Sequence, residues 1–470
     1  EGGINAALNT KDENDSPEEH FTDTIKAACG LADPNAVWGM TQAAPELVHW
    51  LLKLGVKFNM SGYDDVDLRN FGGQKKKRTA FAQSDTGKQI MTAMIDAVRR
   101  KEASGMVERF SHHSFLTLRL CDNICCGCVI RDEYSQETVE LPGDAVIVAT
   151  GGMHGLFGNT TGSLSNTGEV TAELFRLGVP LANGEMIQYH PTTVKCGGKR
   201  MLISEAARGE GGRLFAMKDG KQWYFMEEKY PELGNLMPRD ITAREIWKVS
   251  HESEVFLDMT EISDEIISNK LSGLADDCMT YLHKDIRKEP VSVLPGIHYF
   301  MGGILVDEQH RTPIQNLYAA GECCAQYHGA NRLGGNSLLG ALYGGRVAAK
   351  SACEQADVVD LSCATQIDFP PASQISEIKQ LNKVMQETMG VVRNENTLLN
   401  GIQTVQALTG NLPLLGMAVL KSALARKESR GAHWREDYPK SNDNDYLKTT
   451  VARFDGKQIQ ISFVPVPERR

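Results

Sequence analysis

Residues 145–152 read AVIVATGG, a run of buried-strand residues that ends in two glycines. A second stretch of this kind, LYAAGE, occupies residues 317–322. A glycine directly after a strand lets the backbone approach a phosphate group closely. The acidic Glu322 in the second turn can accept hydrogen bonds from ribose hydroxyls. The two stretches therefore predict an α/β sheet that binds a nucleotide, with an ordinary α/β turn as the alternative.

The glycine fingerprint G-x-G-x-x-G of dinucleotide-binding folds is absent from the chain. In such folds it lies in an N-terminal βαβ unit of about 30 residues. The sequence begins Glu1-Gly2-Gly3, without a methionine. We therefore expect that the N-terminal unit precedes Glu1 and is missing from this sequence.

Composition is typical of a globular protein with about three domains. The 470 residues are 41% hydrophobic and 23% charged, and the net charge is −10. Because a nonspecific nucleic-acid binder needs a basic excess, we expect no nucleic-acid partner. No apolar run reaches the roughly 18 residues of a spanning helix, so a membrane link would have to run through a partner.

Eleven cysteines, an odd number spread thinly, indicate a reducing compartment and not a secreted disulfide framework. Cys125-x-x-Cys128 could suggest a metal or redox site. The stretch alternates like a strand and no second pair of this spacing follows it. We interpret these cysteines as core thiols and expect no metal ion.

Helix signals are clearest near the start of the chain. Pro17 follows Ser16, a good N-cap residue, and begins one helix. Pro34 begins another, and Pro45–Leu54 is predicted to be a separate third helix. The basic run Lys75–Arg78 is interpreted as a solvated or interface loop.

The middle and end of the chain differ in character. Residues 191–298 combine glycine-rich turns, an aromatic cluster and helix-like stretches, which indicates an inserted domain. Residues 356–430 are mostly helical, with a linker expected at Pro370 and Pro371. In residues 431–470, polar and apolar residues alternate more than in the helical part.

The loop HGANRLGGNS at 328–337 precedes a helix and carries one arginine, Arg332. A helix N-terminus favours an anion, and a guanidinium group can bind a carboxylate or phosphate through two hydrogen bonds. A solvated loop arginine is the alternative. Further candidates lie near turn signals and are weak singly: His190, Ser204, Glu205, Arg208, Arg239 and His298. Cationic groups that converge on one pocket would suit a dianionic substrate.

Taken in order, these motifs resemble those of one family, the flavoprotein subunits of succinate dehydrogenase and fumarate reductase. The resemblance is collinear and covers nearly the whole chain. The stretch DGKQWYFMEEKYPELGN at 219–235 is most similar to the subgroup that works with menaquinone. The matching stretches are EGGINAALNT at 1–10, FGGQKKKRTAFA at 71–82, ATGG at 149–152, NGEMIQYHPT at 183–192, SEAARGEGGRL at 204–214, NLMPRDITAREI at 235–246, GIHYFMGGI at 296–304, LYAAGEC at 317–323, HGANRLGGNSL at 328–338 and ESRGAHWREDYP at 428–439.

The resemblance implies an α/β fold with four parts. A Rossmann-like, FAD-binding dinucleotide domain (1–190 and 299–355) is interrupted by an α+β capping domain (191–298). A helical domain (356–430) and a small C-terminal domain (431–470) follow. The helical part is short for the family, so further segments are expected to be missing near 365–371 or after 409.

The resemblance also implies roles for individual residues. Arg239 would be the proton donor to the substrate carbon, and Glu205 and Arg208 the relay that reprotonates it. The substrate carboxylates would be held by His190, Ser204, His298 and Arg332, with Phe71 as a wall of the pocket. The expected FAD contacts are Gly2, Gly3, Ala149, Thr150, Gly151, Glu169, Glu322, Asn336, Ser337 and Leu338. The family more often has Asp at the position of Glu169 and Thr at that of Ser204.

The implied enzyme interconverts fumarate and succinate, in anaerobic respiration or the citric acid cycle. Its FAD would be bound covalently only through a histidine upstream of Glu1, and the sequence leaves that open. The implied partners are an iron–sulfur subunit and a cytochrome b type membrane anchor, which carry the iron–sulfur clusters and haem and lead to the quinone pool. The implied location is peripheral, on the cytoplasmic side of the bacterial inner membrane.

Two other functions compete with this one. L-aspartate oxidase, a soluble FAD enzyme of NAD biosynthesis, has the same layout. It has an acidic residue in the Phe71 loop, where this chain reads Asn70-Phe71-Gly72-Gly73. A noncatalytic FAD-binding assembly subunit would lack the set formed by Arg239, Glu205 and Arg332.

Overall fold

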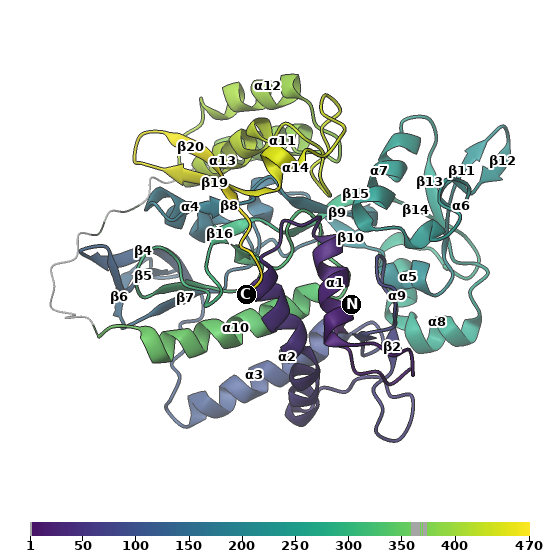
Figure 1. Ribbon diagram of the computed structural model, residues 1–470, viewed down its shortest axis with the longest axis horizontal. Helices are drawn as coiled ribbons and strands as arrows, with labels where there is room; N and C mark the ends of the chain where they lie inside the picture. Colours follow the sequence, from purple (N-terminus) through teal and green to yellow (C-terminus); the bar gives the residue numbers. More distant parts are fainter. Residues whose placement is uncertain (1, 359–366, 368, 370–373) are drawn as a thin grey trace.

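A computed structural model describes residues 2–358, 367, 369 and 374–470 of the chain. Figure 1 shows the elements of the C-terminal part at the top, those of segment 191–298 at the right, and three long helices in the lower half. The long helices α2 (Pro34–Leu54), α3 (Thr86–Ala103) and α10 (Asn336–Gln355) lie side by side along one edge. The linker expected at Pro370 and Pro371 lies outside the described residues.

The stretches 145–152 and 317–322 contain neighbouring parallel strands. β7 (Val146–Val148) pairs with β17 (Leu317–Ala319), with Val146 opposite Leu317 and Val148 opposite Ala319. Gly151 and Gly321, in the turns that follow, both have positive φ angles of 72° and 81°. Because parallel strands end at the same edge of a sheet, the two turns meet there.

Other sheets join segments that are distant in sequence. β8 (Leu181–Ala182), β16 (Gly303–Leu305), β18 (Cys324–Ala325) and the C-terminal hairpin of β19 (Lys448–Phe454) and β20 (Ile459–Pro465) form one sheet in the order β18-β16-β8-β19-β20. The short strands β1 (Ile4–Asn5), β2 (Leu68–Arg69) and β3 (Thr79–Ala80) form another.

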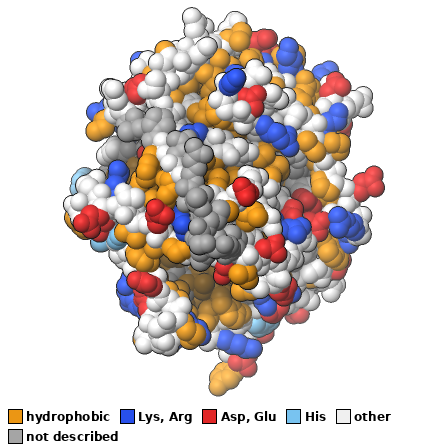
Figure 2. All heavy atoms as spheres, turned by 90° about the vertical axis from the view of Figure 1, so that its left-hand side faces the viewer, with side chains coloured by type: hydrophobic (Ala, Val, Ile, Leu, Met, Phe, Trp, Pro, Cys, Tyr) orange, Lys and Arg blue, Asp and Glu red, His pale blue; other side chains and the backbone are white. Residues whose placement is uncertain are grey.

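A three-stranded meander forms one end of the molecule. It consists of β4 (His113–Cys121), β5 (Ile124–Asp132) and β6 (Thr138–Pro142). Cys125 is a buried free thiol on β5, as expected for a core cysteine, and so is Cys126, whereas Cys128 is a free thiol that is only half-buried. Figure 2 shows this end of the molecule, where hydrophobic side chains lie among charges of both signs.

The longest strand of the described structure, β9 (Ile187–Cys196), extends from the core into the segment 191–298. It pairs with β10 (Lys199–Leu202) on one side and with β15 (Leu294–Phe300) on the other. The β9–β15 register shifts twice, between Leu294 and Gly296 and again between Ile297 and Tyr299. These irregularities change which side chains face each other next to His190 and His298.

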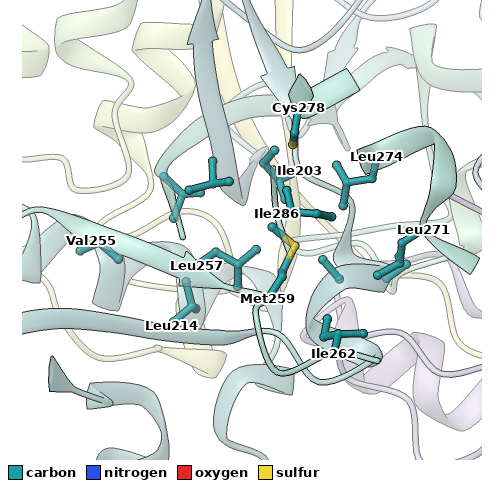
Figure 3. Packing of buried hydrophobic residues seen from close by; sticks show 14 of the residues in the cluster. Ile203, Leu214, Val255, Leu257, Met259, Ile262, Leu271, Leu274, Cys278 and Ile286 are labelled. Atoms are coloured by element: carbon teal, nitrogen blue, oxygen red, sulfur yellow. The ribbon is translucent and has the colours of Figure 1, made fainter. Parts of the chain in front are cut away.

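Segment 191–298 has a hydrophobic core of its own (Figure 3). Ile203, Leu257 and Ile286 are all at most 1% exposed within it. Phe71, from a distant loop, packs against the same cluster. The elements around this core are α5 (Glu205–Gly209), β11 (Arg213–Lys218), β12 (Lys221–Trp223), α6 (Phe225–Lys229), α7 (Arg239–Val249), β13 (Val255–Asp258), α8 (Asp264–Lys270), α9 (Ser272–Asp277), η3 (Cys278–Leu282) and β14 (Val291–Ser292).

The helices near the C-terminal end share a second core. α11 (Ile375–Thr388), α12 (Glu395–Val405) and α13 (Asn411–Ala425) pack together and against α4 (Glu169–Arg176). The remaining short elements are α1 (Pro17–Ala27), η1 (His154–Leu156), η2 (Gly234–Leu236), η4 (Gly321–Cys323) and α14 (Asp443–Tyr446). Among the helices described here, none is long and apolar enough to cross a membrane.

The prediction of two helices between Pro34 and Leu54 is wrong, because α2 continues through Pro45. An interior proline costs about 3 kcal/mol in a helix. However, α2 buries apolar side chains on both sides of it, among them Met40 and Leu51. Each such side chain contributes about 1.5–3 kcal/mol, so burial offsets the missing hydrogen bond.

The basic run is also only partly solvated. Lys75 and Lys77 are exposed, but Arg78 is fully buried. Arg78 donates to Asp15 from Nη2 (2.8 Å) and Nε (3.1 Å), and its Nη1 lies 3.0 Å from Asp23. This ion triad fastens the end of the 71–78 loop to the start of α1.

We expect Arg78→Ala to lower the free energy of unfolding by about 3–5 kcal/mol, because it leaves two buried carboxylates without their partner. Denaturant unfolding measured by fluorescence would test this. Lys75→Ala, which removes an exposed charge from the same run, should change the unfolding free energy by less than about 0.5 kcal/mol. Equal effects of the two changes would contradict the role given to the triad.

Candidate active site

A cavity of about 180 Å³ lies where the core, segment 191–298 and the loop before α10 meet. It gathers side chains from β9, α5, α7, β15 and the loop that precedes α10. Seven of the eight catalytic and substrate-binding residues predicted from the sequence line it. The lining residues are Gly2, Gly3, Phe71, Gly87, His190, Leu202, Ser204, Glu205, Arg239, His298, Arg332, Gly335, Ser337 and Leu338.

One wall carries a carboxylate between two arginines. Arg239, the first residue of α7, donates to Glu205 Oε2 from Nη2 (2.6 Å) and Nε (3.0 Å). Arg208, three residues after Glu205 on α5, donates to Oε1 at 3.3 Å. The backbone N–H of Gly72 also donates to Oε1, at 3.2 Å. Arg208 lies behind Glu205 and does not itself line the cavity.

These contacts keep Glu205 ionised although it is only 2% exposed. Burial alone would raise the pKa of Glu205, but the charges of Arg239 and Arg208 lower it below its usual value. Ser204, the N-cap of α5, accepts from the Ala206 N–H at 3.3 Å and so sets the direction in which Glu205 leaves the helix.

Gln188 is a site residue that the sequence reasoning missed. Its Oε1 accepts from Arg239 Nη1 at 3.1 Å, and its Nε2 donates to the Arg332 carbonyl (2.9 Å) and to Asn331 Oδ1 (3.0 Å). Gln188 therefore joins the two arginines through one buried amide. One signal in the sequence could have found it. Residues two apart in a strand lie on the same face, so Gln188 shares the face of β9 that carries His190.

Arg332 is a buried cation without a carboxylate partner among the described residues. It is 3% exposed, its guanidinium stacks on the Tyr299 ring at 4.2 Å, and its Nε has no hydrogen-bond partner. Burial, and next the charge of Arg239, lower the pKa of Arg332 to about 9. A buried charge of this kind is costly unless an anion joins it, so the site is prepared for one.

His190 and His298 are uncharged neighbours of these arginines. Their rings meet edge to face, 5.2 Å apart. His298 Nδ1 lies 2.8 Å from the Thr161 hydroxyl, and the Thr192 N–H donates to His190 Nδ1 at 3.2 Å. Burial, followed by nearby positive charge, holds the pKa of both histidines well below the usual value. His190 Nδ1 also lies 3.1 Å from the Thr192 carbonyl oxygen, so Thr192 offers a partner to either tautomer of the neutral ring, and the tautomer with its proton on Nε2 can donate from there.

The floor of the cavity consists of backbone and small residues. Gly2 has φ +84°, and a side chain placed there would point into open space. Gly335 has φ +83°, and a Cβ would lie 2.1 Å from Asn5 Oδ1. Ser337 and Leu338, at the start of α10, complete the floor. A floor with so few side chains suits a flat ring system packed against the carboxylate and arginine wall.

The other predicted cofactor residues lie away from this floor. Ala149 and Thr150 are exposed after β7, and a Cβ on the following Gly152 would lie 2.7 Å from Glu322 Oε1. Glu322 accepts from the Phe300 N–H at 3.0 Å. These groups form a backbone-lined edge that suits the remainder of a long nucleotide ligand.

Asn336 and Glu169 do not line the cavity. Asn336 is fully buried, and its side chain bonds to Asn5, His20 and Thr24. It holds the loop before α10 in place and presents no side-chain group to a ligand. Glu169 is exposed at the first residue of α4.

Comparison with known proteins places this geometry in context. A family model described as an FAD binding domain matches residues 1–338, and one described as fumarate reductase flavoprotein C-term matches residues 408–469. The succinate dehydrogenase flavoprotein subunit of Bacillus subtilis is 36% identical, over 100% of this chain and 91% of its own length. An L-aspartate oxidase from a Nostoc species is 31% identical, over 96% and 86%.

Among solved structures, the flavoprotein FrdA of Escherichia coli quinol fumarate reductase superposes with a TM-score of 0.89. It is 27% identical, and the match covers 99% of this chain and 89% of that one. The family resemblance and the fold class predicted from the sequence are both confirmed. The chain therefore belongs to the succinate dehydrogenase and fumarate reductase flavoprotein family and is an FAD-dependent oxidoreductase.

Proposed function

We propose that this chain is the catalytic flavoprotein subunit that interconverts fumarate and succinate. One observation carries the proposal. The cavity sets the unpaired Arg332 beside the ion pair of Arg239 and Glu205. A dicarboxylate placed there finds a cation for its charge and a proton donor with a proton source behind it.

Binding follows from the charges of the cavity. Arg332 binds one carboxylate through its guanidinium fork. The neutral His190 and His298 and the Ser204 hydroxyl donate to the carboxylate oxygens. Phe71, 3% exposed and packed on the core of segment 191–298, closes the pocket against water. Fixing both ends of the substrate orients its double bond for reaction.

FAD fits the backbone-lined floor and edge described above. Gly2, Gly3, Ser337 and Leu338 would lie against its ring system, and Ala149, Thr150, Gly151 and Glu322 against its remaining part. When bound, FAD supplies or accepts the hydride of the reaction. The contacts of Asn336 and Glu169 with FAD remain part of the proposal, although neither residue lines the cavity.

Proton delivery uses the wall opposite the anion site. In reduction of fumarate, Arg239 gives a proton to the substrate carbon that does not receive hydride. Glu205 is ionised at rest and so acts as a relay: it takes up a proton on the side of Arg208 and passes it from Oε2, 2.6 Å from Arg239 Nη2, to the guanidinium group. Arg208 extends this path from Glu205 Oε1. An arginine holds its proton tightly in water, so the step depends on a strongly basic carbon and on a carboxylate already in contact.

The wider assignment is part of the same proposal. The chain would act with an iron–sulfur subunit and a cytochrome b type membrane anchor, which link it to the quinone pool, here menaquinone. It would lie on the cytoplasmic face of the bacterial inner membrane. We also propose the division into an FAD domain (1–190 and 299–355), a capping domain (191–298), a helical domain (356–430) and a C-terminal domain (431–470).

L-aspartate oxidase is the second candidate, because a relative of that name shares the layout. The charges of the cavity favour the plain dicarboxylate. Among the residues that line the cavity, Glu205 is the sole carboxylate, and Arg239 and Arg208 already occupy it. The ammonium group of aspartate would therefore meet cations and no free carboxylate.

Turnover of the FAD-loaded protein with a reduced viologen dye tests the proposed function. We expect fumarate to oxidise the dye, succinate to reduce an oxidised dye, and L-aspartate to give no oxidation. Aspartate turnover would instead identify an oxidase and overturn the argument from cavity charge. A protein that holds FAD but turns over none of the three would indicate an assembly subunit.

Arg239→Lys should lower kcat for fumarate by about 10²–10⁴-fold, because a shorter cation can balance Glu205 but cannot place its proton at the substrate carbon. The fumarate Kd, measured by perturbation of the flavin spectrum, should change by less than about threefold. Lys248→Arg, on the exposed side of α7, is the control and should leave kcat unchanged. Near-normal turnover of Arg239→Lys would refute the role of Arg239 as acid.

Arg332→Gln should instead weaken the binding of fumarate. We expect a loss of about 2–5 kcal/mol in binding free energy, seen as a higher Kd, because the change removes the cation that pairs with the carboxylate in a buried site. Arg346→Gln changes an exposed arginine on α10 and should leave the Kd unaltered. Spectroscopic titration of both variants provides the comparison. An unchanged Kd in Arg332→Gln would place the carboxylate elsewhere.

A further inference from the structure

A second cleft, of about 520 Å³, opens beside the active-site cavity. Leu202 lines both spaces and forms the partition between them. Thr161, on the wall of the cleft, holds His298 of the active site through its hydroxyl. The cleft is lined by Thr161, Cys196, Lys199, Arg200, Met201, Leu202, Asp277 and Tyr281.

Arg200 is fixed in this cleft and is not a freely moving surface arginine. Its Nε donates to Thr193 Oγ1 at 2.6 Å, and its Nη2 lies 3.3 Å from the carbonyl oxygens of Thr193 and Leu294. Its side chain passes over Gly296, where a Cβ would lie 2.5 Å from Nε. Only a glycine at that position leaves room for the guanidinium group to lie flat across β15.

The positive charge of Arg200 is not neutralised. In the part of the chain that the structure describes, no carboxylate forms an ion pair with it, and its Nη1 has no hydrogen-bond partner. Burial lowers the pKa of Arg200, as expected for a cation without an anion. Lys199, exposed at the adjacent position of β10, adds a second cation.

One acidic group, Asp277 at the end of α9, also lines the cleft. It makes no ion pair with Lys199 or Arg200, and burial raises its pKa. The walls thus carry two cations against one carboxylate. Such an excess in a partly enclosed space raises the local concentration of anions.

We propose that Lys199 and Arg200 form an entry subsite that captures the dicarboxylate before it passes Leu202 into the active site. This inference rests on the proposed function, because it assigns the subsite to the same substrate. Arg200 acts on the approaching dianion through its charge and does not touch the reacting atoms. It therefore governs kcat/KM and leaves kcat unchanged.

The test compares Arg200→Gln with the wild-type enzyme, both purified with FAD, in viologen-linked turnover. At about 0.01 M ionic strength, where the Debye length is about 30 Å, kcat/KM for fumarate should fall about 10-fold. At about 1 M, where that length is about 3 Å, the difference should disappear. Monomethyl fumarate, which carries one charge, should show a smaller loss. Arg200→Lys should restore most of kcat/KM, and Lys221→Gln, on the distant β12, should have no effect.

If Arg200 only supports the fold, the kcat/KM values should follow another pattern. Arg200→Gln would then lower kcat/KM equally for the dianion and the monoanion and at both salt concentrations, and Arg200→Lys would not restore it. That result, or an unchanged kcat/KM at low salt, overturns the entry subsite. A wild-type enzyme that turns over neither compound would refute the proposed function itself, and with it the substrate assigned to the cleft.

Discussion

Three buried guanidinium groups lie around a single carboxylate, that of Glu205, at the centre of this protein. Arg208 and Arg239 bond to Glu205, while Arg332 remains without an anionic partner in the described structure. Burying this excess of positive charge is unfavourable, and the cost is relieved when a dianion enters. Under the proposed function, this charge imbalance would link stability to substrate class, because the same excess of positive charge that destabilises the site would favour a dicarboxylate.

The three buried guanidinium groups repel one another, so the surrounding structure must prevent them from moving apart. Glu185 supplies one anchor at the start of β9, where its carboxylate accepts from Arg426 at 2.7 Å. Arg393, 1% exposed, donates to the Glu185 carbonyl and meets His433 at 2.9 Å. These residues come from the far C-terminal part of the chain. The strand that carries Gln188 is thus fixed by charges more than 200 residues away in sequence.

The sequence was sufficient to predict structure where the local preferences of the residues agree with the tertiary packing. The two strand–turn stretches predicted strands of an α/β sheet, which the structure shows as the parallel pair β7–β17, and the loop before α10 pointed to Arg332. Prediction failed where distant packing decides the outcome. Pro45 is a local helix breaker that is overridden by burial on both sides of it, and Arg78 ends a basic run yet is buried by two carboxylates from another segment. The contact of Asn336 with FAD stays a prediction, while the buried network that its side chain joins was not indicated by the sequence.

Helix α7 sets the position of Arg239, the proposed acid. Arg239 is its first residue, the next residue, Asp240, accepts from Asn331 at 3.1 Å, and Arg244 stacks on Trp434 at 4.0 Å. The helix is therefore fastened to the loop that carries Arg332 and to the C-terminal segment. A shift of α7 would move Arg239 and strain both contacts at once. The distance between Arg239 and Arg332 thus depends on how segment 191–298 rests on the core, so the contacts of α7 fix the proposed acid and the proposed anion site relative to each other.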